Sequence, residues 1–247
     1  MVSTVPPDQH PATRSLLKPD ENSPLWTAAG SGRHPGGRAS QCGVLPILLV
    51  HGGLWEPMDA ARFWVRPGIV ADLTDRGHVV IAPDRLTFAP SWAAEVEYLL
   101  PRLPHGKVVV IGGSNGCSVA ARLAVEHPER IGGLILAWPA TNGDPQVDAS
   151  ASDHLRTQGA SDEIVANLLD GGTIRGVTDE QLATLPMKVA VLRSIPENRM
   201  HQRRTVDALL ATVKGSVQLP GCPEPPRPDF AQHRPEFIEA IECMRDR

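Results

Sequence analysis

The chain of 247 residues lacks the features that mark several large classes of protein. No apolar run approaches the roughly 20 residues that a membrane-spanning helix needs, so we expect no membrane partner. The net charge is −4 and no basic stripe is present, which excludes a nucleic-acid partner of the usual kind. Residues 1–17 contain no charged segment followed by an apolar one, so we expect no secretory signal and a cytoplasmic location.

Cysteine and nucleotide-binding motifs are also scarce. The four cysteines are widely spaced, and none belongs to a CxxC pair or to a Cys/His ligand pattern. This usage is typical of reduced thiols, and it predicts no metal site. Neither a Walker-type loop nor a GxGxxG follows a predicted strand, so we expect no cofactor.

The sequence divides into an arm, a core and an insertion. Residues 1–43 are rich in Pro, Gly, Ser and Arg, and they predict a flexible arm with an edge hairpin. In 44–140 and 186–247, short apolar runs alternate with helical stretches, which predicts an α/β core with a mostly parallel sheet covered by helices on both faces. Residues 141–185 break this rhythm with short helices, so we expect a small helical lid there.

The expected strands and helices follow from the hydrophobic pattern and the turn residues. The predicted strands cover 46–50, 78–82, 107–111, 131–137, 187–192 and 216–219. The predicted helices of the core cover 60–76, 92–103, 114–127, 201–213 and 235–244.

The segment Gly112-Gly113-Ser114-Asn115-Gly116 stands between a strand-like run and a helix-like run. A serine at the apex of such a turn is held in a strained backbone conformation, and only small flanking residues let the strand and the helix approach each other. The start of the helix also offers free N–H groups to an oxyanion. Ser114 is therefore the predicted nucleophile.

A serine hydroxyl needs a base, and the base needs a group that orients it. In a parallel sheet these partners gather at the carboxyl ends of the strands. His233 lies in a loop after the last predicted strand, and we predict it as the base. His201 is expected only to open a helix. Glu197 follows the strand 187–192 and is the predicted acid, while Asp144 and Asp229 remain alternatives.

The first strand of the core runs into His51-Gly52-Gly53-Leu54. Glycines here let backbone N–H groups approach a reacting carbonyl, so the N–H of Gly53, with that of Leu54 as a further donor, and the N–H of Asn115 form the predicted oxyanion hole. His51 is expected to pin this loop through its ring nitrogens. Trp55, Met58 and Trp138 are candidate residues of a substrate pocket; for the two tryptophans, packing in the core is the competing interpretation.

Together these motifs resemble the α/β-hydrolase superfamily from about residue 44 to the C-terminus. The resemblance rests on the His-Gly-Gly strand end, the serine elbow, the segment His127–Leu136, an acid after the penultimate strand and a late histidine. It implies the chain order serine, acid, histidine, with Glu197 where family members usually carry Asp. Residues 83–88 depart from the Gly-rich loop that the family usually has there, and the first two strands of the fold are barely visible.

The leading hypothesis is a serine hydrolase that cleaves an ester or thioester of a small apolar or aromatic acyl group through an acyl-serine. A first alternative is an acyltransferase that passes the acyl group from a carrier-bound thioester to an alcohol, thiol or amine. A second alternative is a non-catalytic protein that binds a small ligand under the lid. Lyase or C–C bond chemistry on the same residues also stays open. The expected partner is a small acyl substrate, free or on a carrier protein, and the chain is expected to be a monomer or a homodimer.

Overall fold

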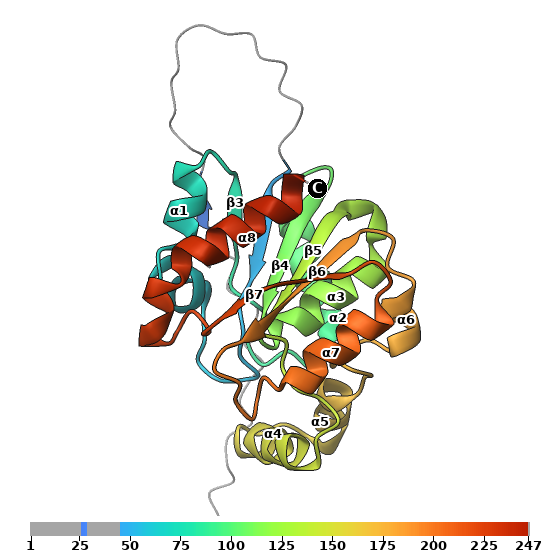
Figure 1. Ribbon diagram of the computed structural model, residues 1–247. Coiled ribbons are helices and arrows are strands. Elements are labelled where there is room, and N and C mark those ends of the chain that lie inside the picture. The colour runs from blue at the N-terminus through green and yellow to red at the C-terminus, as the bar shows by residue number, and fades with distance from the viewer. Residues whose placement is uncertain (1–25, 29–44, 247) are drawn as a thin grey trace, which may run out of the picture.

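A seven-stranded sheet forms the centre of the computed structural model, which describes residues 26–28 and 45–246 (Figure 1). Its strand order is β1-β3-β2-β4-β5-β6-β7. The strands β2 to β7 run parallel to their neighbours, and β1 pairs antiparallel with β3 at one edge. The predicted mostly parallel α/β sheet is confirmed. The strands are β1 (Trp26–Ala28), β2 (Ile47–Val50), β3 (Val80–Ala82), β4 (Val108–Gly113), β5 (Ile131–Ala137), β6 (Lys188–Ser194) and β7 (Val217–Cys222).

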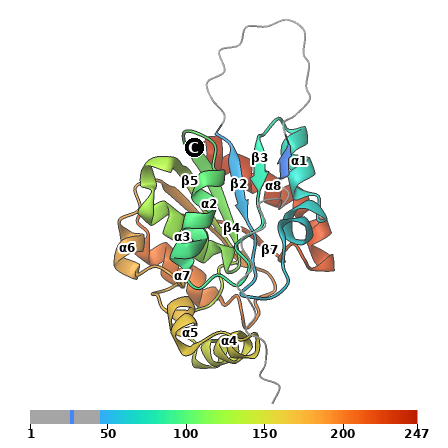
Figure 2. The same cartoon turned by 180° about the vertical axis from the view of Figure 1, so that it is seen from behind.

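Helices cover both faces of the sheet, as the nearly continuous apolar strands require (Figures 1 and 2). On one face lie α1 (Ile69–Asp75) and α8 (Arg234–Asp246), with the π-helical turn Ala61–Val65. On the other lie α2 (Trp92–Leu99), α3 (Gly116–Glu126) and α7 (Arg203–Thr212). Short 3-10 turns cover Leu100–Arg102, Pro128–Arg130 and Pro228–Gln232.

The alternation of side chains along each strand divides the core in two. In β2, Leu48 and Val50 pack into the cluster beneath α2 and α3, whereas Ile47 and Leu49 pack into the cluster beneath α1 and α8. All four are at most 1% exposed. Burial on both sides removes a large apolar area from water, and each Å² of it stabilises the fold by roughly 25 cal/mol. The packed strands are thereby held in place, and so are the positions at which they end.

The insertion between β5 and β6 forms three helices, α4 (Pro145–Thr157), α5 (Asp162–Leu169) and α6 (Asp179–Ala183). Figure 1 shows α4 and α5 together at one end of the sheet, away from its centre. Two of these helices begin with capping side chains: the Ser161 hydroxyl accepts from the N–H of Ile164, and Thr178 forms a capping box with Gln181.

The expectation of a flexible arm over 1–43 lies outside the described residues, apart from the edge strand Trp26–Ala28. Across residues 45–246, none of the helices combines the length and the apolar character that crossing a bilayer requires.

Candidate active site

Ser114 lies at the tip of a tight turn between β4 and α3. Its φ angle is +54°, a left-handed conformation that a residue with a Cβ rarely adopts. A Cβ at Gly116 would lie 2.4 Å from the carbonyl oxygen of Val50, and one at Gly112 would lie 2.6 Å from that of Gly116. Glycine at both positions therefore lets α3 start directly against the ends of β2 and β4, which holds Ser114 at the carboxyl edge of the sheet.

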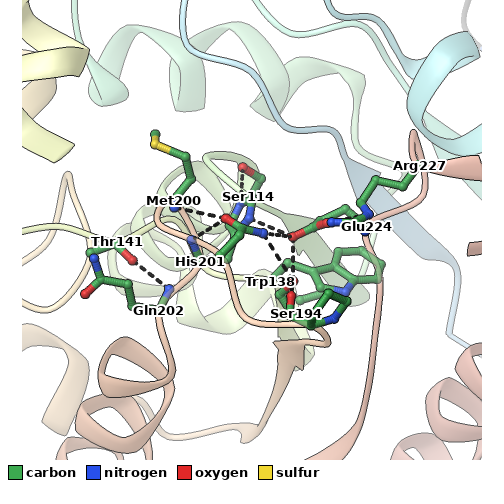
Figure 3. Close-up of polar contacts among 12 residues, drawn as sticks. Ser114, Trp138, Thr141, Ser194, Met200, His201, Gln202, Glu224 and Arg227 are labelled. Carbon is green, nitrogen blue, oxygen red and sulfur yellow. Dashed lines mark hydrogen bonds and ion pairs between the residues drawn. The ribbon is translucent and has the colours of Figure 1, made fainter. Parts of the chain in front are cut away.

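The histidine beside Ser114 is His201. Its Nε2 lies 3.0 Å from the Ser114 Oγ, and it comes from the loop between β6 and α7 (Figure 3). An imidazole at this distance can take the hydroxyl proton when the serine attacks. Its other ring nitrogen must then carry the hydrogen, since only the neutral Nε2 can accept.

Glu224 faces that other nitrogen from just beyond the end of β7. Its Oε1 lies 2.7 Å from the His201 Nδ1. The Nδ1–H bond does not point at this oxygen closely enough for a well-aligned hydrogen bond. Catalytic hydrogen bonds are often poorly aligned in the absence of substrate and tighten when it binds. Burial opposes ionisation of Glu224, but the imidazole of His201 beside it and the hydrogen bond from Ser194 outweigh this effect and lower the pKa of Glu224 to about 2. The carboxylate therefore stays charged and favours a hydrogen on Nδ1.

Asn198 ties the carboxylate to the histidine loop. Its Nδ2 donates to the Glu224 Oε1 at 2.9 Å, while its Oδ1 accepts from the backbone N–H of His201 at 3.1 Å and of Met200 at 2.9 Å. The Ser194 hydroxyl donates to the same carboxylate oxygen at 2.7 Å. One amide side chain thus fixes both the acid and the backbone of the base.

Thr141 holds the same loop from the opposite side. Its N–H donates to the carbonyl of Met200 at 2.8 Å, and its hydroxyl accepts from the N–H of Gln202 at 2.9 Å (Figure 3). The loop around His201 therefore has hydrogen-bond partners before and after the imidazole, which limits the positions that the ring can take.

The predicted pair of Ser114 and His233 is wrong. His233 lies at the start of α8, with its ring nitrogens 3.3 Å from the Gln232 side chain and 4.0 Å from Glu236. The 3-10 turn Pro228–Gln232 separates it from the end of β7, so it does not lie at the strand end where a partner of Ser114 is needed.

The predicted acid Glu197 also has another contact. Its Oε1 accepts from the backbone N–H of Arg203 at 3.0 Å, at the beginning of α7. Of the alternatives, Asp144 caps α4 through the N–H groups of Gln146 and Val147. Asp229 forms a two-contact ion pair with Arg227 at 3.0 and 2.8 Å. All three carboxylates are used in local structure, and the carboxylate beside His201 is that of Glu224.

The backbone N–H groups of Gly53 and Asn115 are available to an oxyanion. Neither has an acceptor among the described residues, and a Cβ at Gly52 would lie 3.0 Å from that of Ser114, so the loop after β2 passes beside the serine. The third predicted donor, the N–H of Leu54, already has an acceptor. It donates to the Glu56 carboxylate at 3.1 Å.

His51 pins this loop as expected. Its Nε2 accepts from the backbone N–H of Arg85 at 3.0 Å, and its Nδ1 lies 2.7 Å from the carbonyl oxygen of Gly52. Burial, together with the charge of Arg85, lowers the pKa of His51 to about 3. The ring is therefore neutral near neutral pH, with its hydrogen on Nδ1.

The His51–Leu54 loop lines a cavity of about 350 Å³. Trp55, Met58 and Phe88 contribute to its wall, and Gln158 and Leu168 reach it from the insertion. The indole of Trp55 meets the Phe88 ring edge to face at 5.2 Å. The expectation for Trp55 and Met58 is thus consistent with a pocket.

Trp138 does not line this cavity. It is fully buried, stacks on Phe237 with ring centroids 5.1 Å apart, and donates its indole N–H to the carbonyl of Cys222 at 2.8 Å. The pocket prediction for Trp138 is therefore wrong, and the competing interpretation, packing in the core, is correct. Within residues 45–246, no group of three or more His, Cys, Asp or Glu side chains is arranged to hold a metal ion.

Solved structures with a similar fold come from several hydrolases. A meta-cleavage product hydrolase from Pseudomonas fluorescens IP01 has a TM-score of 0.61 and 15% identity, covering 89% of this chain and 94% of its own. A 2-hydroxy-6-oxo-6-phenylhexa-2,4-dienoate hydrolase from Rhodococcus sp. strain RHA1 has a TM-score of 0.58 and 19% identity, and the match covers 80% of this chain and 91% of its own. A thermophilic esterase from Thermogutta terrifontis has a TM-score of 0.60 and 19% identity, and the match covers 90% of this chain and 93% of its own. At these identities the likeness concerns the fold.

Sequence comparison gives the family directly. No curated protein matches the chain at a significant level. The profile described as the alpha/beta hydrolase fold matches residues 46–171, just over half of the chain, and this range includes the His-Gly-Gly strand end and the serine elbow. The chain therefore belongs to the α/β-hydrolase family.

Proposed function

We propose that the protein is a serine hydrolase in which Ser114, His201 and Glu224 act as nucleophile, base and orienting acid. The observation that carries this proposal is the chain of contacts from the Ser114 Oγ to the His201 Nε2 at 3.0 Å and from the His201 Nδ1 to the Glu224 Oε1 at 2.7 Å. The proposed substrate is an ester or thioester of a small apolar or aromatic acyl group, because Trp55, Met58 and Phe88 line the neighbouring cavity.

The proposed reaction has two halves. The Ser114 Oγ attacks the acyl carbon while His201 takes its proton, and the oxyanion that forms accepts hydrogen bonds from Gly53 and Asn115. The alcohol or thiol then leaves with the proton from His201, and the acyl-serine remains. Water attacks this ester, gives its proton to His201, and releases the acid with the serine restored. Glu224 keeps the imidazole in the right tautomer and stabilises the imidazolium.

Intact mass spectrometry after mixing with p-nitrophenyl esters of graded size tests this proposal. We expect a mass increase equal to one acyl group in the wild type and none in Ser114→Ala. Unchanged ester hydrolysis in Ser114→Ala would contradict it. If added alcohols, thiols or amines divert the acyl group from the free acid, the acyltransferase alternative replaces hydrolysis. If activity on every ester is absent while Ser114→Ala still binds ligand, the non-catalytic alternative replaces both.

A further inference from the structure

Arg85 makes an unusual set of contacts with the loop that contains Gly53. Its Nη1 donates to three consecutive carbonyl oxygens, those of His51 at 3.1 Å, Gly52 at 3.2 Å and Gly53 at 2.8 Å. Its backbone N–H also donates to the His51 Nε2 at 3.0 Å. Because β2 and β3 are parallel neighbours, the segment that follows β3 lies beside the segment that follows β2, which brings Arg85 to this loop.

Glu95 on α2 fixes the other side of the guanidinium. The Arg85 Nε donates to the Glu95 Oε2 at 2.7 Å, and Nη2 donates to Oε1 at 2.5 Å. Both side chains are buried, with 7% and 3% exposure. With Nε and Nη2 bound to Glu95, the two N–H bonds of Nη1 remain for the loop carbonyls.

The direction of these carbonyls determines where the adjacent N–H groups point. In a trans peptide unit, the C=O of one residue and the N–H of the next are antiparallel. The Gly52 oxygen lies 2.7 Å from the His51 Nδ1 and 3.2 Å from the Arg85 Nη1, so the N–H of Gly53 points away from both side chains. Gly53 itself has a φ of +98°, which only glycine adopts readily, and its N–H has no acceptor among the described residues.

We infer that Arg85, held by Glu95, is a positioning residue that orients the Gly53 N–H toward the oxyanion at Ser114. This inference rests on the proposed function. It also assigns a role to residues 83–88, where the sequence departs from the Gly-rich loop of its family. An unpaired buried charge is costly, so the arrangement requires Arg85 and Glu95 together.

The test compares a p-nitrophenyl ester with its thiono analogue, in which sulfur replaces the carbonyl oxygen. Sulfur is a weak hydrogen-bond acceptor, so an oxyanion hole stabilises the ester reaction far more than the thionoester reaction. The test variants are Arg85→Lys, which keeps the charge opposite Glu95, and the double variant Arg85→Met with Glu95→Leu, which removes both buried charges at once.

In both variants we expect kcat for the ester to fall by about 100-fold, with KM little changed, and kcat for the thionoester to fall much less. The matched control is Glu224→Gln, which should slow both substrates by the same factor because it acts through the base. Equal losses for ester and thionoester in the Arg85 variants, or no loss, would overturn the inference. Thermal unfolding confirms that each variant is folded before it is assayed.

The measurements distinguish a failure of the proposed function from a failure of the inference about Arg85. A wild-type protein that forms no acyl-Ser114 and hydrolyses neither substrate would overturn both proposals. A wild type that forms acyl-Ser114, with Arg85 variants that keep the wild-type ratio of ester to thionoester rates, would overturn the inference about Arg85 alone.

Discussion

His201 and Glu224 lie 2.7 Å apart, yet they follow β6 and β7 in the reverse of the order that the family resemblance implies. The resemblance places an acid after the penultimate strand and a histidine after the last one. Here the histidine follows the penultimate strand and the acid follows the last. The two strands are parallel neighbours, so their carboxyl ends are adjacent, and either loop can supply either partner.

Removing the charge of Glu224 should slow the chemical step. We expect Glu224→Gln to lower kcat by about 10⁴-fold, because an uncharged side chain no longer holds the imidazole in the required tautomer. The measurement is steady-state hydrolysis of a p-nitrophenyl ester. Glu197→Gln is the matched control and should keep wild-type kcat, since that carboxylate only accepts from the N–H of Arg203. A large loss in Glu197→Gln with none in Glu224→Gln would refute this assignment.

Asn198→Ala should weaken catalysis without removing a reacting group. The change deletes the hydrogen bonds to the Glu224 Oε1 and to the backbone N–H of His201, so the base and its acid can separate. We expect kcat to fall by about 10- to 100-fold, as for the loss of hydrogen bonds to a charged group. A change in KM alone would argue against this role.

The buried His51 should make the protein less stable in mild acid. Its pKa of about 3 in the fold lies below the ordinary value of 6.5, so the unfolded chain binds a proton between these values and the folded chain does not. The stability contributed by His51 is therefore complete above pH 6.5 and declines as the pH falls toward 3. Urea unfolding between pH 5 and pH 7 should show a smaller change in His51→Gln than in the wild type. Equal slopes would contradict the assignment.

Trp138 and Trp55 should respond differently to truncation. Trp138 is fully buried against Phe237, so Trp138→Ala should cost about 3–5 kcal/mol in the free energy of unfolding. Trp55 borders the cavity, so Trp55→Ala should cost less and should instead change the dependence of kcat/KM on acyl size. Denaturant unfolding and an ester series measure the two effects. A Trp55 variant with unchanged acyl preference would show that the cavity is not a substrate site.

Much of the fold follows from the sequence. The alternating apolar and helical segments predict every core strand, because strands buried on both faces must be nearly continuous in Val, Ile and Leu. The serine elbow can also be predicted from the sequence, because the positive φ of Ser114 and the close approach at Gly112 and Gly116 allow few residue types. The role of His51 in pinning its loop was also predicted from the sequence.

The base and the acid could not be chosen in this way. The strands β6 and β7 extend to Ser194 and Cys222, two and three residues beyond their predicted ends. These extensions place Glu224 at the carboxyl edge of the sheet and leave His233 beyond a further 3-10 turn. A carboxylate two residues after a strand was the available signal for Glu224, and the family order favoured a different choice.

The contacts of Asn198 and Arg85 also could not be predicted from the sequence. Both depend on which carbonyls and carboxylates the loops bring within 3.2 Å, and this is set by tertiary packing rather than by a local pattern. Trp138 illustrates the same limit. Its position after β5 suits a pocket or a core equally, and only the packing of α8 decides between them.

The central claim is that His201, and no other histidine, activates Ser114. The most direct test is the second-order rate constant for labelling of Ser114 by a fluorophosphonate, followed by intact mass in the wild type, His201→Asn and His233→Asn. We expect labelling to fall by at least about 1,000-fold in His201→Asn and to stay at the wild-type rate in His233→Asn. Rapid labelling of His201→Asn, with loss of labelling in His233→Asn, would contradict this claim.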